Sequence, residues 1–243
     1  MSSSAANFKL RVVLLPLLLW LPAAWALRPL EQRLAAPQVQ RAQFDRLGGN
    51  GLIGMLGGMR AAVASGLWLR THRAWEQQDA AGTKTLLQLT VAADERPLYF
   101  WLNGARMLAC DIPTWSGAPD QPEVVRRKAV RDGMAEAQAF LKEGLRAHPE
   151  SAEILIEMAN LQLRAGGDRE TAAALFRCAA GQPGAPHYAA RIHGELLREL
   201  GRPEEALAWL REILPGLPAD VPSACRGVVE QRIKALEAEL GEK

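Results

Sequence analysis

The feature that most constrains the fold is a helix–break–helix plan that occurs twice in succession toward the C-terminus. In the first unit an apolar helix is expected over 152–164, two adjacent glycines interrupt it, and a second helix is expected over 169–180. Residues 187–214 repeat the plan, and Gly201 is expected to end the first helix of that unit. Because no helix of such a unit buries its apolar face alone, the plan predicts helix pairs that stack on their neighbours.

The second helix of each unit carries a small residue, a large apolar residue and a third contact residue at i, i+4 and i+7. The three sets are Ala137, Leu141 and Gly144; Ala172, Phe176 and Ala179; and Ala206, Leu210 and Ile213. With the prolines that precede following units, this arrangement resembles the tetratricopeptide repeat (TPR) family over about 134–214. Gly167 is an additional turn residue, and His193 stands where the family usually has leucine. The resemblance implies an all-α fold, a right-handed α-solenoid of helix pairs.

Upstream of this region the pattern is weaker. Helices are expected at 82–94 and 97–109, and the next one begins near Glu123 after the loop "CDIPTWSGAPDQP". The apolar residues of the C-terminal segment share one helical face, as in a helix that covers the last apolar surface of a solenoid; they are Val229, Ile233, Leu236 and Leu240. The expected organisation is a signal or anchor segment at 1–27, a stalk at 28–50, TPR-like repeats at 51–214 (degenerate over 51–149, clearer over 150–214) and a capping helix at 215–243.

Residues 12–27, "VVLLPLLLWLPAAWAL", form an apolar segment behind Lys9 and Arg11, as in signal peptides and signal anchors. The Ala-Trp-Ala sequence at 24–26 fits the small-x-small cleavage rule, so cleavage near Ala26 is one outcome. An uncleaved single-pass anchor is the other. Its 16 residues reach about 24 Å, against a hydrocarbon core of about 30 Å. Both outcomes predict that the following chain is exported across a bacterial inner membrane.

Residues 51–70, "GLIGMLGGMRAAVASGLWLR", have two interpretations, a second membrane span or the first helix of the repeat array. Arg60 near the centre costs about 2.5–3.5 kcal/mol inside a bilayer, which favours the helix outside it. An apolar stripe is expected to face the core; it consists of Leu52, Leu56, Met59, Val63 and Leu67. A strip of small residues is expected to admit a partner helix; it consists of Gly54, Gly58, Ala61 and Ser65.

Charge and cysteine usage argue against two kinds of ligand. The chain carries 29 basic and 27 acidic residues, and both excess cations lie within 1–26, so the remainder is neutral and nucleic acid is not the expected partner. Cys110, Cys178 and Cys225 have no CxxC or His-containing spacing, which predicts no disulfide framework and no metal site. They are expected to be small buried apolar side chains.

The sequence contains no recognised catalytic motif. The four histidines, His72, His148, His187 and His193, stand in no known spacing with a serine, cysteine or carboxylate. The glycines at 47–58 match neither a phosphate-binding loop nor a dinucleotide-binding turn. We therefore expect no catalytic residue, no cofactor and no enzymatic activity.

The resemblance to TPR proteins implies that the first helices of the pairs line a concave groove that holds a segment of a partner protein. The implied groove residues are Glu153, Ile156, Asn160, Leu163, Arg164, Tyr188, Arg191, Glu195 and Arg198. Asn160 matches the asparagine of the family's carboxylate clamp, but Ile156 stands where the clamp has lysine, so a chaperone's C-terminal carboxylate is not the expected ligand. Most of these residues, taken singly, also suit a solvated helix face.

Two features outside the groove have competing interpretations. Trp115, among Pro, Gly and Asp, is either a docking residue or a lid that folds back on neighbouring helices. The cluster "RRKAVR" at 126–131 is either a solvated helix face or a contact for anionic lipid.

These observations predict a non-enzymatic, membrane-tethered scaffold or assembly factor that binds other proteins on the periplasmic face of the inner membrane. One alternative is a soluble periplasmic adaptor, released by cleavage near Ala26. Another is a permanent structural subunit of a larger membrane complex, with the 51–69 segment as an interface. The identity of the partner and the oligomeric state do not follow from the sequence.

Overall fold

The computed structural model describes residues 50–115, 121–164 and 167–241, and their side chains from Gly58 onward. All regular structure within these ranges is helical, so the protein is all-α as expected. The expected signal or anchor segment at 1–27 and nearly all of the expected stalk lie outside the described residues. Within the described ranges, no helix combines the length and the apolar character needed to cross a membrane.

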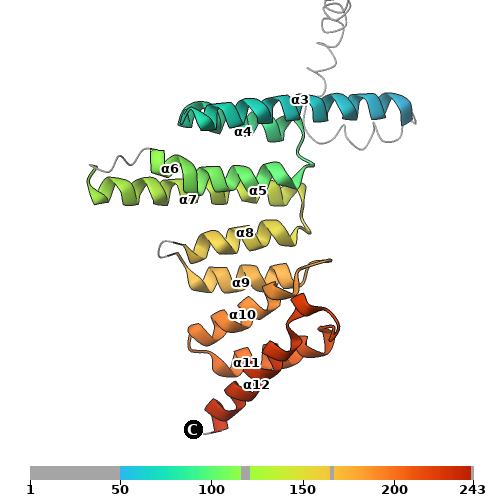
Figure 1. Cartoon of the computed structure of the whole chain (residues 1–243), viewed down its shortest axis with the longest axis vertical. Coiled ribbons are helices and arrows are strands. Elements are labelled where there is room, and N and C mark those ends of the chain that lie inside the picture. Colours follow the sequence, from blue (N-terminus) through green and yellow to red (C-terminus); the bar gives the residue numbers. More distant parts are fainter. Residues whose placement is uncertain (1–49, 116–120, 165–166, 242–243) are drawn as a thin grey trace, which may run out of the picture. The chain divides into compact units, whose positions relative to one another are not determined.

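The helices pack in consecutive pairs along the unit Gly57–Lys243 (Figure 1). The first elements are α3 (Asn50–Glu76), α4 (Ala80–Ala93), α5 (Leu98–Arg106), the π-helical segment η2 (Met107–Asp111), α6 (Ile112–Trp115) and α7 (Glu123–Ala147). The later ones are α8 (Ala152–Leu163), α9 (Arg169–Ala180), α10 (His187–Glu199), α11 (Pro203–Ile213), the short 3₁₀ turns η3 (Leu214–Gly216) and η4 (Pro222–Ala224), and α12 (Arg226–Gly241). α5 pairs with α7, α8 with α9 and α10 with α11, while α7–α8 and α9–α10 contacts join successive pairs. α12 packs on α11, as expected for a capping helix.

Side-chain caps set the starts of α8 and α9. Ser151 Oγ accepts a hydrogen bond from the Ile154 N–H at 3.2 Å, and Asp168 Oδ1 accepts one from the Glu170 N–H at 2.9 Å. The Thr171 hydroxyl also donates to Asp168, and this bond is the main cause of a lowered pKa at that carboxyl. Each cap satisfies an N–H group that a helix start otherwise leaves unpaired. Both helices therefore begin within one residue of the positions expected from the sequence.

The residues that were expected to mediate pairing between helices are buried. The three sets are buried except for Ile213, which is partly buried: Ala137, Leu141 and Gly144; Ala172, Phe176 and Ala179; and Ala206, Leu210 and Ile213. A Cβ atom at Gly194 would lie 2.8 Å from Leu210 Cδ2, and one at Gly144 would lie 2.9 Å from a ring carbon of Trp101. Glycine at these positions lets the facing helices approach more closely than any other residue allows.

The buried side chains form three clusters. The N-terminal cluster joins α3, α4, α5 and α7, with the rings of Trp101 and Phe140 4.8 Å apart at its centre. The middle cluster surrounds Phe176, which is fully buried between α8, α9 and α10. The C-terminal cluster brings Leu210 of α11 against Val229 and other residues of α12. Each cluster draws on helices that are adjacent in the chain, so the core follows the chain from pair to pair.

The apolar stripe expected to face the core on α3 is wrong at Met59 and Val63, whereas its Leu67 is partly buried. Met59 and Val63 are 51% and 54% exposed, whereas Ala64, Trp68 and Thr71 are buried. Trp68 packs its ring against other aromatic rings from α5, including that of Phe100 at 5.2 Å. Because the tryptophan offers much more apolar surface than methionine or valine, its burial sets the rotation of the helix.

The helix expected at 97–109 is longer than predicted. It continues through η2 into α6 and ends at Trp115, so the first part of the expected loop is helical. Ile112 and Pro113 are both buried in this extension, which packs along α7. Residues 116–120 of the expected loop lie outside the described residues.

Candidate functional site

The residues predicted to line a partner-binding groove lie on α8 and α10, except for Arg164, which directly follows α8. Those exposed to solvent are Glu153, Leu163, Arg164 and Tyr188, and those partly buried are Asn160, Arg191, Glu195 and Arg198. Ile156 is only 5% exposed and belongs to the middle cluster, so it contributes to the core rather than to a surface. Of this set, only Arg164 lines either of the two clefts described below.

Two of the predicted groove residues are engaged in ion pairs within the protein. Arg198 pairs with Glu195 one turn away on α10, and Arg232 of α12 approaches the same carboxylate at 3.0 Å. The hydrogen bond from Arg198 is the main cause that lowers the pKa of Glu195. The ion pair between Arg232 and Glu195 connects α12 to α10, so these side chains stabilise the packing of α12.

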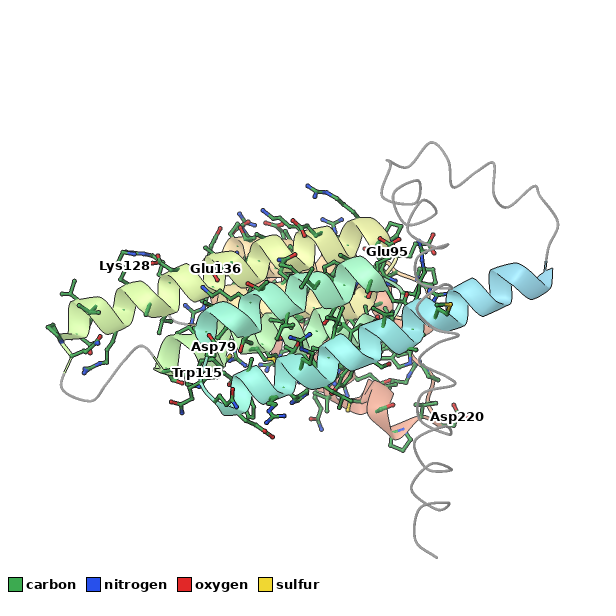
Figure 2. All side chains as sticks on the ribbon, turned by 90° about the horizontal axis from the view of Figure 1, so that it is seen from above. Asp79, Glu95, Trp115, Lys128, Glu136 and Asp220 are labelled. Atoms are coloured by element: carbon green, nitrogen blue, oxygen red, sulfur yellow. The ribbon has the colours of Figure 1, made fainter. Side chains whose placement is uncertain are left out.

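Trp115 folds back on the helices, as one of its two interpretations predicted. Its ring meets that of Trp75 edge-on, with centroids 6.5 Å apart, and it packs on the N-terminal cluster. Trp75 Nε1 in turn donates a hydrogen bond to Asp111 Oδ2 at 2.8 Å. Trp115 therefore connects the end of α6 to α3. Figure 2 labels this residue.

The strip of small residues on α3 is uncovered where its surroundings are described. Gly58 and Ala61 are exposed, and a Cβ atom at Gly58 would meet no atom within 4 Å. The side chain of Leu69 on the same helix is 72% exposed. Gly54 lies in α3, but its surroundings fall outside the described side chains.

The basic cluster at 126–131 is largely paired with acids of its own helix. Glu123 binds both Arg126 and Arg127, and Lys128 binds Asp132. Hydrogen bonds from Arg127 and then Arg126 lower the pKa of Glu123, and the one from Lys128 lowers that of Asp132. Arg131 differs, because it makes no ion pair with any residue that the structure describes.

His193 joins three helices. It is 5% exposed, and its Nδ1 lies 2.8 Å from the Ala173 carbonyl oxygen of α9. Its ring meets Trp209 of α11 edge-on at 4.8 Å, and the Arg177 guanidinium lies 5.8 Å from the centre of that same indole. Burial lowers the pKa of His193 below its usual value of 6.5. A neutral imidazole here satisfies a carbonyl and packs in a core position.

A cleft of about 460 Å³ opens beside His193 between α9 and α11. Its charged lining is mixed, with Glu170, Glu205 and Glu212 beside Arg177 and Arg202. Among the described residues, no group of three or more His, Cys, Asp or Glu side chains is arranged to hold a metal ion. The paired acids and bases of this cleft serve helix packing, as in the Arg202–Glu170 bridge of 2.8 Å between α11 and α9.

The other histidines and the cysteines are dispersed. His148 Nε2 lies 2.8 Å from the Glu95 carbonyl oxygen, and His72 packs edge-on against Trp68 at 5.0 Å. All three cysteines are free, and Cys178 is exposed rather than buried as expected.

A second cleft, of about 590 Å³, lies between α7 and the end of α8, and no motif in the sequence predicts it. Its lining includes Arg127, Val130, Arg131 and Met134 from α7, Leu161 from α8 and Arg164 just beyond it. The sequence indicates this cleft only indirectly, because the helix expected from near Glu123 is longer than the helix expected over 152–164. This cleft combines arginine side chains with the apolar residues Val130 and Met134.

Comparison of the chain with protein-family models and with curated proteins finds no match.

Proposed function

We propose that the protein is a non-enzymatic, TPR-like scaffold that is tethered to a bacterial inner membrane and binds other proteins on the periplasmic face. The observation that carries this proposal is the series of consecutive helix pairs whose contact residues, such as Phe176 and Leu210, stand at the small–large–small positions of the family. Helices repeated in this way present broad surfaces for other proteins, and the exposed Glu153 of α8 and Tyr188 of α10 offer charge and aromatic area for such contacts. The apolar segment at 12–27 supports the tether.

A test of the binding surface uses the full chain expressed in a bacterial membrane. Partners are crosslinked, recovered by a C-terminal tag and identified by mass spectrometry, for the wild type and for the double variant Glu153→Lys/Tyr188→Ala. We expect the double variant to lose the specific partner. Glu204→Lys is the matched control, because Glu204 is likewise an exposed acid in the first turn of its helix but lies on α11. Equal recovery with all three proteins would contradict this surface.

The tether and the adaptor alternative make different predictions for the mature protein. An uncleaved anchor predicts that the full mass is found in the membrane fraction, whereas cleavage near Ala26 predicts a soluble protein that starts at Leu27. Fractionation with mass measurement of the intact chain distinguishes them. Recovery of the full-length chain from the cytoplasm would contradict both the membrane tether and the periplasmic adaptor.

A second candidate function, a permanent subunit of a larger complex, is supported by the apolar surface of α3. Met59, Val63 and Leu69 are exposed on this helix in the unit Gly57–Lys243, and exposed apolar residues of this number on one helix often mark an interface. This function predicts that the isolated full chain in detergent associates with itself or with other subunits through α3. Substitution of the three residues by serine would then yield a monomer in sedimentation analysis.

A further inference from the structure

The cleft between α7 and α8 arises from a difference in helix length. α7 has 25 residues and runs about 37 Å, whereas α8 has 12 residues and runs about 18 Å. The two helices are joined by the short turn at 148–151 and run antiparallel, so α8 ends beside the middle of α7. The first half of α7 therefore continues past α8; Figure 2 shows Lys128 on this projecting part. The step between the two helices is the cleft.

The charged residues that the structure describes in the lining of this cleft are all basic. They are Arg127, Arg131 and Arg164, and no carboxylate is among the described lining residues. Arg127 shares Glu123 with a neighbouring arginine, whereas Arg131 and Arg164 make no ion pair with any described residue. Unpaired guanidinium groups that converge on one cleft attract carboxylates and form hydrogen bonds with them through a planar fork of donors.

One of the unpaired guanidinium groups is also held in place. Arg164 Nη1 donates a hydrogen bond to Cys110 Sγ at 2.8 Å, which connects the end of α8 to η2. A side chain that is already fixed loses less conformational freedom when it binds a ligand than a free arginine does. Arg164 is therefore a preorganised donor at one edge of the cleft.

The remaining lining is apolar or uncharged. Val130 and Met134 of α7 are partly buried, and Leu161 of α8 is 2% exposed. Gln138 adds a side-chain amide, whose Nε2 donates to the Met158 carbonyl oxygen at 2.8 Å. A cleft of about 590 Å³ admits a few side chains, and this lining suits carboxylates flanked by an apolar group.

We propose that this cleft binds an acidic segment of a partner protein, with carboxylates on Arg131 and Arg164 and an apolar side chain against Val130 and Met134. The inference rests on the proposed scaffold function and specifies the chemistry of one partner segment. The protein's own N-terminal region is a poor occupant, because residues 1–49 hold six basic residues and two acidic ones. Its charge has the same sign as the cleft, which favours a segment of another chain as the occupant.

The test measures binding of a defined probe to the full chain in detergent. The probe is a short fluorescent peptide of Glu-Glu-Leu repeats, and its twin carries glutamine in place of every glutamate. We expect the acidic peptide to bind at least about tenfold more tightly than its twin, with an affinity that falls as salt is added. We expect Arg131→Glu and Arg164→Glu each to weaken binding of the acidic peptide about tenfold.

Lys142→Glu is the matched control. Lys142 is an exposed cation of α7, makes no ion pair with a described residue and does not line the cleft, and its replacement changes the charge by the same amount. Circular dichroism checks that each variant keeps its helix content, and Arg131→Gln and Arg164→Gln provide milder versions. Equal binding of the two peptides, or an equal loss in Lys142→Glu, would overturn the proposal.

Two further outcomes assign the cleft to another occupant. Binding to anionic phosphatidylglycerol vesicles that depends on Arg131 and Arg164, without acidic-peptide binding, would make it a lipid site. Self-association that both charge reversals abolish would make the occupant a second copy of this chain. The proposed function is tested separately by crosslinking. If Glu153→Lys/Tyr188→Ala loses the partner and neither charge reversal has an effect, the proposed function stands and only the role of this cleft is contradicted.

Discussion

A Cβ atom at Gly133 would lie 2.6 Å from the Leu108 carbonyl oxygen, so α7 crosses the π-helical segment at backbone contact. The same Cβ position is 2.5 Å from Pro113 Cγ. Neither the carbonyl nor the proline ring is a flexible side-chain end that moves aside. Gly133 is therefore the residue that lets α7 pack along η2 and α6.

We expect Gly133→Ala to destabilise the protein by about 2–3 kcal/mol, because the added methyl group forces the two backbones apart. Equilibrium unfolding in urea measures the change. Gly66→Ala is the matched control within α3: no atom lies within 4 Å of its Cβ position, so the loss of glycine's chain entropy should stabilise by about 0.5–1 kcal/mol. A stable Gly133→Ala variant would mean that the helices are not in contact here.

The buried imidazole of His193 should make stability depend on pH. Its pKa is lowered in the folded protein, chiefly by burial and also by Arg177, against the opposing effects of the hydrogen bond to the Ala173 carbonyl and of Glu205. Below the ordinary value of 6.5 the unfolded chain binds a proton that the folded protein does not, so stability falls as the pH falls from there toward the folded pKa.

The slope from this residue reaches at most about 1.4 kcal/mol per pH unit. Urea unfolding at a series of pH values measures it in the wild type and in His193→Leu, in which the side chain at this position cannot titrate. We expect the variant to lose this part of the slope. An identical slope in both proteins would show that His193 is not its source.

Trp115 should matter for stability and not for partner binding. Because its ring is partly buried against Trp75, we expect Trp115→Ala to cost about 2 kcal/mol, less than a fully buried tryptophan would. Thermal unfolding measures the loss, and crosslinking of the partner should remain as in the wild type. Loss of the partner with unchanged stability would instead identify Trp115 as a docking residue.

The capping role of α12 is tested at Leu236. This side chain is 1% exposed within the C-terminal cluster, so we expect Leu236→Ala to destabilise by about 2–4 kcal/mol. Glu239→Ala, one turn along on the exposed face, is the control and should change stability by less than about 0.5 kcal/mol. Urea unfolding compares the two, and equal effects would indicate that α12 does not cover the core.

The helix pairs between Glu123 and Ile213 were predictable because local signals agree there. Ser151 and Asp168 cap the helices they precede, Gly201 adopts a φ of +75° just after α10, and the small–large–small spacing selects one face of each second helix. When capping, turn chemistry and apolar periodicity indicate the same boundaries, the helices form where the sequence predicts them. Phe176 is fully buried for this reason.

The surfaces were less predictable than the helices. Ile156 was assigned to the groove from its position in the repeat, but the middle cluster buries it. Glu195 and Arg198 were assigned to the same groove, and they form ion pairs that involve Arg232, more than thirty residues away in the chain. Periodicity along one helix indicates which face a residue lies on, but the exposure of that residue depends on the neighbouring helix.

The glycine-rich helix at the start of the array illustrates the same division. Its sequence determined that it is helical, and the periodicity determined which residues share a face. That Trp68 rather than Met59 faces the core was decided by packing between helices, because the tryptophan ring packs against aromatic side chains of α5 such as Phe100. The cleft between α7 and α8, which brings Arg131 and Arg164 together, likewise exists only because two helices of unequal length pack side by side. Periodicity is a local property of the chain, whereas burial and clefts depend on how separate helices pack, so only the tertiary structure decides them.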